Sequence, residues 1–340
     1  MNSKIISVLK YIVLLAVAIG LLALAFKGIS VNVILHEMLQ AKLSWLLIAV
    51  IIGLAGFVSR AIRWKLLIES LGFTPSLKNT TASLMVGYFA NLAFPRLGEV
   101  TRCGSLSKAE SIPFSSLLGT VIVERVIDVL SLLILLFLSS ILEIDRLGNF
   151  LHDNIIKPLG IKLKTVMSSP GIIAIAIILF VALLVMIFII MRRSKQNKEE
   201  SKFVHLVKGL LSGLQSVAKL KRPWLFLFHS VFIWFLAFLG MYVSFQALPS
   251  TSDLGMTAAL FILVISGLGM AAPVQGGIGA FHLLVSQGLV LYGLSQQDGL
   301  TFATLVHALS LVLVVVCGIT SLILLFSANK KRLQENIKQQ

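Results

Sequence analysis

The chain has 340 residues, of which 57% are hydrophobic and 13% charged, and its mean hydropathy is +0.98. These values exclude an ordinary soluble globular protein and indicate that most of the chain lies in lipid. The net charge of +15 fits the basic cytoplasmic loops of a membrane protein, so we do not expect nucleic-acid binding. Cys103 and Cys317 show no framework spacing and are expected to be free thiols.

Six apolar stretches reach or approach the ~20 residues that a helix needs to cross about 30 Å of hydrocarbon. They are Tyr11 to Phe26, Ser44 to Val58, Val129 to Leu142, Gly171 to Met191, Trp224 to Phe245 and Thr301 to Phe326. The first follows Lys4 and Lys10 and is similar to a signal peptide, but its length favours retention as a spanning helix. We predict an all-α polytopic membrane protein with a single transmembrane domain over residues 1–340, ending in a cytoplasmic tail at 327–340.

Four further apolar stretches are short or interrupted by Gly and Pro, and we expect them to form half-helices. They cover residues 80–95, 113–124, 257–272 and 278–294. Two pairs of segments then form re-entrant helical hairpins, 79–112 from the cytoplasmic face and 257–294 from the outer face. With about six spanning helices, this layout resembles the inverted arrangement of secondary transporters. Non-helical backbone at membrane depth needs polar surroundings, so we expect both turns to face a polar cavity. The alternative is an ordinary bundle of eight to ten helices with loops at the Gly and Pro positions.

The distribution of Lys and Arg sets the orientation, because these residues mark cytoplasmic loops. Nineteen of the 29 fall in segments that this topology places inside, nine of them in 192–223, and six fall in the outer segments 27–43 and 143–170. We expect a protein of the cell inner membrane with both termini in the cytoplasm. Within the basic loop 192–223, the part from Phe203 to Leu220 is amphipathic and is expected to lie on anionic lipid.

Arg60, Arg63 and Trp64 share one helix face in SRAIRWKLL, just past the second predicted span. Two arginines on one face can clamp a phosphate, and Trp favours the headgroup level of the membrane. The alternative is a cytoplasmic anchor whose side chains extend to the interface.

The segment GYFANLAFPRLGEVTR contains Asn91, Arg96, Glu99 and Arg102 around the turn of the first hairpin. Ionisable groups at membrane depth are costly unless they pair or meet a ligand. We expect Arg96 and Arg102 to bind an anionic headgroup, with Glu99 positioning one of them or moving a proton. A salt-bridged cytoplasmic loop remains the alternative.

Glu124, Arg125 and Asp128 begin a long apolar run in GTVIVERVIDVLSLLIL. Glu124 and Asp128 share a helix face at i, i+4, and Arg125 can reach Asp128 at i, i+3. The excess of negative charge requires a partner such as Arg96 or Arg102. This intramembrane charge network has either a structural role, fixing the first hairpin, or a functional one.

The second hairpin, SGLGMAAPVQGGIGAFHLLVSQG, turns at Gly276, Gly277 and Gly279. A helix that restarts near Gly279 would direct free N–H groups toward an anionic headgroup, whereas close helix packing explains the same glycines without a ligand. His282 and His307 both lie at membrane depth, where they are either packing residues or a facing pair that relays protons.

In chain order, RxxRW, the segment from Gly87 to Arg102, ERxxD and PxxGGIGxF resemble the transmembrane region of lysylphosphatidylglycerol synthases, from about Arg60 to Gly318. The resemblance implies a stand-alone flippase region without the synthase domain. That family pattern usually has Glu after the second hairpin and often Arg in the last span, and here His282 and His307 stand at those places.

We therefore expect a lipid flippase or transporter that moves an anionic or phosphate-bearing lipid, either a phospholipid or a polyprenyl-phosphate-linked lipid. The alternatives are an intramembrane transferase acting on a polyprenyl phosphate and a non-transporting accessory protein. The sequence suggests no catalytic residue, metal or cofactor, since no DxD or Walker A pattern occurs. Its expected partners are membrane lipids with anionic headgroups and a synthase or glycosyltransferase.

Overall fold

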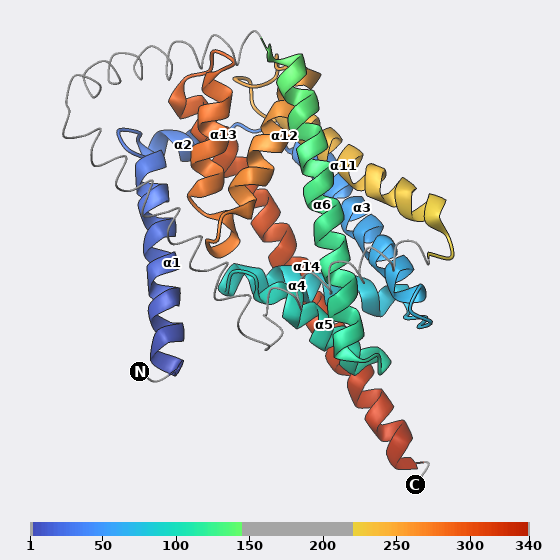
Figure 1. Cartoon of the computed structure of the whole chain (residues 1–340). Coiled ribbons are helices and arrows are strands. Elements are labelled where there is room, and N and C mark those ends of the chain that lie inside the picture. Colours follow the sequence, from blue (N-terminus) through green and yellow to red (C-terminus); the bar gives the residue numbers. More distant parts are fainter. Residues whose placement is uncertain (1–2, 145–219, 339–340) are drawn as a thin grey trace, which may run out of the picture. The chain divides into compact units, whose positions relative to one another are not determined.

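A computed structural model describes residues 3–144 and 220–338, and all regular structure in these two ranges is helical. In chain order, the helices of the first range are α1 (Ser3–Ala25), α2 (Val31–Leu39), α3 (Leu43–Glu69), α4 (Leu77–Ala93), α5 (Leu97–Glu110) and α6 (Phe114–Leu142). Those of the second range are α11 (Pro223–Phe245), α12 (Met256–Ala271), the 3-10 turn η2 (Gln275–Gly277), α13 (Ala280–Val290) and α14 (Gln296–Lys338) (Figure 1). The predicted span at Gly171 to Met191 and nearly all of the basic loop 192–223 lie outside the described residues.

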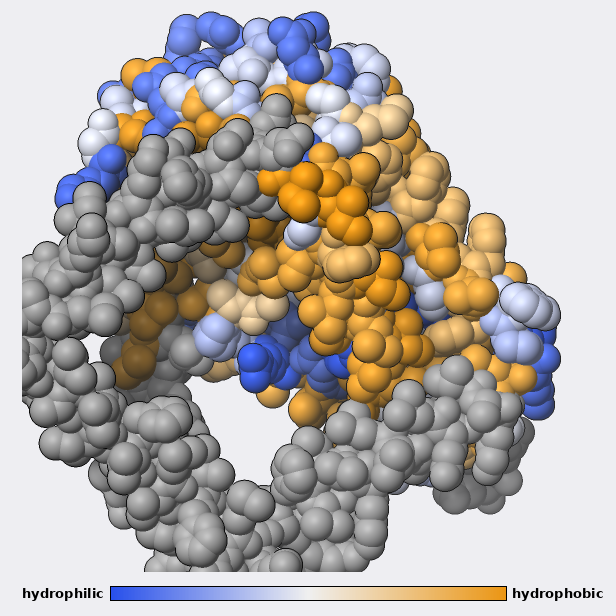
Figure 2. Space-filling view, turned by 45° about the horizontal axis from the view of Figure 1, so that its top comes forward, coloured by the Kyte–Doolittle hydropathy of each residue, from blue (hydrophilic) through white to orange (hydrophobic). Residues whose placement is uncertain are grey.

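Three of the described helices, α3, α11 and α14, are long and apolar enough to cross a membrane. They contain the predicted spans that begin at Ser44, Trp224 and Thr301, while those that begin at Tyr11 and Val129 lie in α1 and α6. Large apolar side chains on their outer faces are exposed, among them Leu47 on α3 and Ile323 on α14. Figure 2 shows such an apolar surface with a hydrophilic patch between its parts. In lipid this exposure has no hydrophobic cost, and the chain is an integral membrane protein.

The expectation of a separate half-helix at 113–124 is wrong, because α6 runs without interruption for 29 residues from Phe114. A single internal glycine, Gly119, costs a helix only about 1 kcal/mol, so it does not break the run. Pro113 instead precedes the first turn, where its fixed φ does no harm. Glu124 therefore lies about 15 Å along a continuous helix.

The first predicted hairpin is formed by α4 and α5, which have 17 and 14 residues. Their lengths of about 26 and 21 Å are less than the ~30 Å of a bilayer core. The two arms approach closely at Gly87 and Gly98, since a Cβ on Gly87 would lie 2.8 Å from the carbonyl oxygen of Gly98. Arg96 forms the turn in the left-handed region at φ 66°.

The second predicted hairpin is formed by α12, η2 and α13, and its two helices have 16 and 11 residues. Gly276, Gly277 and Gly279 have φ of 55°, 76° and 83°, values that L side chains rarely adopt. The arms pack closely, because a Cβ on Gly269 would lie 2.9 Å from the Cα atom of Phe281. Both hairpins are thus confirmed as pairs of short helices.

The turns of the two hairpins meet each other. A Cβ built on Gly276 in η2 would lie 3.3 Å from Leu92 at the end of α4 and 3.7 Å from Leu311 on α14. The other side of the second turn packs on α1, where Gly279 lies against the backbone of Ala18 and Leu22. Segments from both halves of the chain therefore join at the hairpin tips.

Candidate functional site: an ion-pair network beside the first hairpin

Glu124 of α6 is the centre of a buried group of ion pairs. Its Oε1 accepts a hydrogen bond of 3.1 Å from Arg63 on α3, and its Oε2 accepts one of 2.7 Å from Arg102 on α5. The side chains of all three residues are at most 2% exposed. One carboxylate of α6 therefore links α3 and α5 to α6. Arg102, one of the two partners expected for the negative charges of α6, pairs with Glu124.

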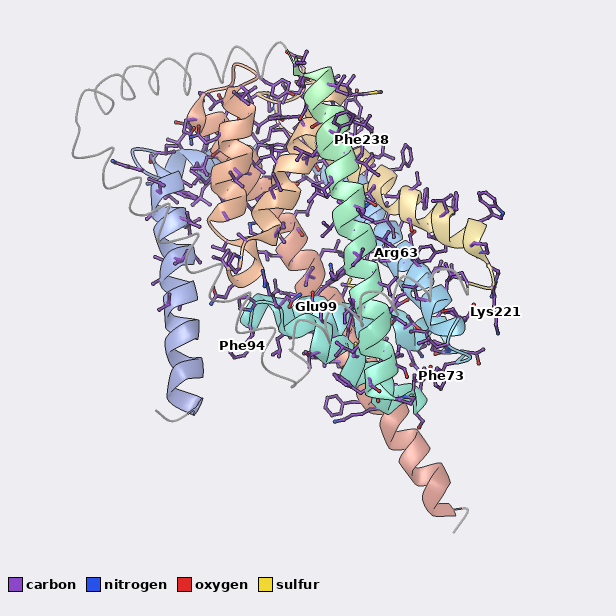
Figure 3. All side chains as sticks on the ribbon, viewed as in Figure 1. Arg63, Phe73, Phe94, Glu99, Lys221 and Phe238 are labelled. Carbon is purple, nitrogen blue, oxygen red and sulfur yellow. The ribbon has the colours of Figure 1, made fainter. Side chains whose placement is uncertain are left out.

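Asp128 lies one helical turn beyond Glu124 and continues the network. It accepts hydrogen bonds of 2.6 Å from Arg63 and 3.2 Å from Arg60. Both arginines of the expected phosphate clamp therefore already pair with carboxylates of α6. Arg63 on α3 and Glu99 on α5 are labelled in Figure 3, which shows them on either side of this part of α6.

The edge of the network is looser than its centre. Arg125 lies 3.4 Å from Glu99 and 3.7 Å from Asp128, and the side chains of Arg125 and Glu99 are 42% and 26% exposed. In total four arginines meet three carboxylates, which leaves a formal charge of +1. Arg96, in the hairpin turn, is exposed and outside the network, with no ion-pair partner in residues 3–144 or 220–338.

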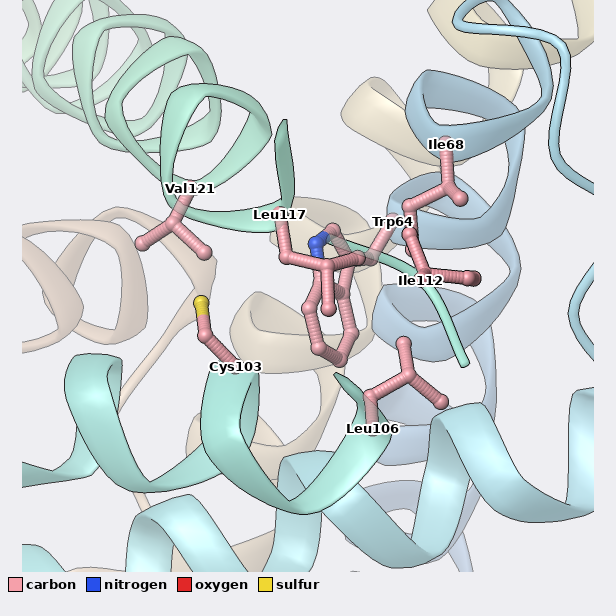
Figure 4. Close-up of a cluster of buried hydrophobic side chains, with 7 residues drawn as sticks. All are labelled: Trp64, Ile68, Cys103, Leu106, Ile112, Leu117 and Val121. Carbon is pink, nitrogen blue, oxygen red and sulfur yellow. The ribbon is translucent and has the colours of Figure 1, made fainter. Parts of the chain in front are cut away.

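An apolar cluster supports the network from below. Trp64, Cys103, Leu106 and Leu117 are fully buried where α3, α5 and α6 meet (Figure 4). The Trp64 Nε1–H donates a hydrogen bond of 2.9 Å to the hydroxyl of Thr120. The guanidinium of Arg102 lies 4.7 Å from the centre of the Trp64 ring. The motif RxxRW therefore supplies two arginines of the network and the tryptophan ring on which Arg102 packs.

Some buried polar atoms in the network form no hydrogen bond with the described residues. Arg63 and Arg102 each leave Nε and Nη1 without a hydrogen-bond partner among the described residues, and Glu99 leaves Oε2. Nothing in the spacing of these residues predicts such orphan atoms, because they depend on how α3, α5 and α6 pack.

Asn91 has a structural contact within the first hairpin. Its Oδ1 accepts a hydrogen bond of 2.6 Å from the backbone N–H of Gly98, across the turn. The expected role of Asn91 in headgroup binding has therefore to compete with a role in holding α4 and α5 together.

The two histidines face each other at the second hairpin, as the proton-relay hypothesis requires. Their ring centroids are 4.8 Å apart. The Nε2–H of His307 donates a hydrogen bond of 2.9 Å to the carbonyl of Gly276. The backbone N–H of Gly279 donates one of 3.4 Å to Nδ1 of His282. Both rings thus bind the backbone of the turn.

Gln275, beside this turn, was not anticipated from the sequence. Its side chain is 4% exposed, and both polar atoms of its amide lack a hydrogen-bond partner in the described part of the chain. A polar residue inside a Gly-rich turn at membrane depth is the signal that indicates it.

A groove of about 370 Å³ lies away from the hairpin turns, between α3, the start of α4 and α14. Its lining residues are Val58, Leu77, Lys78, Thr81, Ala82, Ser321 and Leu324. It is largely apolar with one lysine, so it is not the polar cavity expected at the turns.

Comparison with known proteins places this architecture in a described family. The family named Lysylphosphatidylglycerol synthase TM region matches residues 11–318. The UPF0104 membrane protein MJ1595 of Methanocaldococcus jannaschii is 29% identical over 126 residues, which is 36% of this chain and 38% of that protein. No solved structure matches the chain. The match over most of its length shows that this chain belongs to the lysylphosphatidylglycerol synthase transmembrane-region family.

Proposed function

We propose that the protein is a lipid flippase that moves an anionic or phosphate-bearing lipid, either a phospholipid or a polyprenyl-phosphate-linked lipid, between membrane leaflets. The observation that carries the proposal is the ion-pair network, in which seven ionisable side chains meet beside a hairpin too short to span the bilayer. Ionisable groups within a membrane commonly mark the route of polar cargo.

The network would lower the barrier that limits lipid exchange. An uncompensated headgroup charge in hydrocarbon is strongly disfavoured, so the headgroup needs fixed charges along its path while the acyl chains stay in the bilayer. Arg96 is the cation that the headgroup would meet first, because it is exposed in the hairpin turn and carries no ion-pair partner among the described residues. Arginine also matches a phosphate with two parallel N–H donors.

The direction of the hairpins follows from the proposed topology. The excess of Lys and Arg in the expected cytoplasmic segments supports a cell inner-membrane protein with both termini in the cytoplasm. The first hairpin would then open toward the leaflet in which the lipid is made, where a synthase or glycosyltransferase would deliver it.

The test reconstitutes the protein in vesicles and follows how fast fluorescent phospholipids and polyprenyl-phosphate analogues become accessible to a membrane-impermeant quencher. We expect exchange faster than in protein-free vesicles, and a reduction of about tenfold in Arg96→Ala, the loss of roughly one charge-assisted hydrogen bond.

The matched control is Arg222→Ala, because Arg222 is an exposed arginine that pairs with Glu69 away from the network. Its rate should equal that of the wild type. Exchange that stays at the protein-free level for every lipid contradicts the flippase proposal. Exchange that survives intact in Arg96→Ala contradicts the assigned entry residue.

A further inference from the structure

Arg125 differs from the other three arginines of the network. Arg60, Arg63 and Arg102 each donate a hydrogen bond of 2.6 to 3.2 Å to a carboxylate. Arg125 makes only longer contacts, 3.4 Å to Glu99 and 3.7 Å to Asp128, and its Nε has no hydrogen-bond partner among the described residues. It also has the most exposed side chain of the four, at 42%.

The carboxylates show the same division. Glu124 is bound by Arg63 and Arg102, and Asp128 by Arg63 and Arg60, so neither depends on Arg125. Glu99 pairs with Arg125 alone in the described part of the chain, and its Oε2 is unused. Removing Arg125 from these contacts therefore leaves the buried centre of the network intact.

From this division we infer that Arg125 is the exchangeable arginine of the site. It gives up its contact with Glu99 and binds a monoanionic phosphodiester headgroup instead. The inference rests on the proposed function and refines it, since it names the residue and the charge of the headgroup. The seven-residue network has a formal charge of +1, so one negative charge neutralises it. A neutral complex is favoured where the dielectric constant is low.

Competition between Glu99 and the phosphate predicts effects of opposite sign. In Glu99→Gln the competing carboxylate is gone, so binding of the phosphodiester tightens about two- to fivefold, the worth of a half-exposed ion pair. In Arg125→Gln the receiving cation is gone, so binding weakens by at least that factor. If the pair only held α5 to α6, both substitutions would break the same contact and change binding in the same direction.

The experiment titrates the purified full chain in detergent with dihexanoyl phosphatidylglycerol and, separately, with inorganic phosphate. Arg125→Lys keeps the charge and should retain most of the affinity, which separates loss of charge from loss of fold. Opposite shifts for Glu99→Gln and Arg125→Gln, seen with the lipid, support the inference. Shifts of the same sign overturn it, and equal binding of inorganic phosphate overturns the assignment to a lipid headgroup.

Exchange of fluorescent phosphatidylglycerol between leaflets is measured on the same variants. Fast exchange without opposite binding shifts contradicts the role of Arg125 and leaves the flippase proposal standing. Opposite binding shifts support the binding site, and they contradict the flippase proposal if neither phosphatidylglycerol nor the polyprenyl-phosphate analogues exchange above the protein-free level.

Discussion

Glu124 carries the largest single energetic role in the network, because it alone neutralises Arg102 and shares Arg63 with Asp128. Glu124→Gln removes the charge and keeps the shape of the side chain, so a guanidinium stays buried without compensation. We expect a loss of about 3 to 5 kcal/mol in unfolding free energy. Reversible unfolding in mixed micelles, followed by tryptophan fluorescence, measures it.

Glu69→Gln is the matched control for this change. Glu69 is buried, but its partners Arg222 and Lys65 have side chains that are 60% and 30% exposed, so water solvates both cations when the carboxylate is lost. Its loss should be about 0 to 1 kcal/mol. Equal losses in the two variants would mean that the buried network adds no more stability than an ion pair whose cations reach water.

At the residue scale, the sequence predicted which residues belong together better than it predicted their partners. The i, i+4 spacing placed Glu124 and Asp128 on one face of a helix, which the structure bears out. Spacing within one helix does not say which helix that face meets. The pairing of Arg60 with Asp128 therefore had no signal along the chain, and the orphan amide of Gln275 had only its polarity.

The first hairpin depends on two glycines that let its arms touch. A Cβ on Gly98 would overlap the carbonyl oxygen of Gly87 and lie 2.6 Å from the side-chain nitrogen of Asn91. Gly98→Ala must push α5 away from α4, and we expect it to cost about 1 to 3 kcal/mol of unfolding free energy, the range for overpacking. It should also slow lipid exchange, since Glu99 and Arg102 lie on the displaced helix.

Gly104→Ala provides the control on the same helix. No atom lies within 4 Å of a Cβ built there, so alanine should stabilise α5 by up to about 1 kcal/mol through its higher helix propensity. Chemical denaturation of both variants in one detergent compares them directly. A Gly98→Ala protein as stable as Gly104→Ala would show that the arms can separate freely.

At the element scale, hairpins were predictable because Pro95 and the glycines of the second turn interrupt apolar runs too short to span. The continuity of α6 was not, because Gly119 and three charged residues resemble a break in the sequence alone. In the fold those charges are neutralised by α3 and α5, which removes the reason for the helix to end there. Tertiary pairing thus decided a boundary that local sequence left open.

The described helices combine an apolar outer surface with polar contacts gathered beside the two hairpins. The turn of the second hairpin packs on the end of α4, and the ion-pair network lies beside α5, so both hairpins converge on one region of the bundle. A displacement of either hairpin would therefore shift the other through the contact between Gly276 and Leu92.

Topology is the prediction on which this arrangement rests, because it decides which hairpin opens to which side. In a background with Cys103→Ala and Cys317→Ala, we expect Lys27→Cys to react with a membrane-impermeant maleimide applied to intact cells. Lys78→Cys should react only after the membrane is permeabilised, since it lies at the start of α4, on the proposed cytoplasmic side. Both lysines are exposed, so unequal labelling reports sidedness and not burial. The reverse pattern would place the first hairpin on the outer face and reverse the proposed direction of headgroup entry. Equal labelling in intact cells would contradict a span between the two positions.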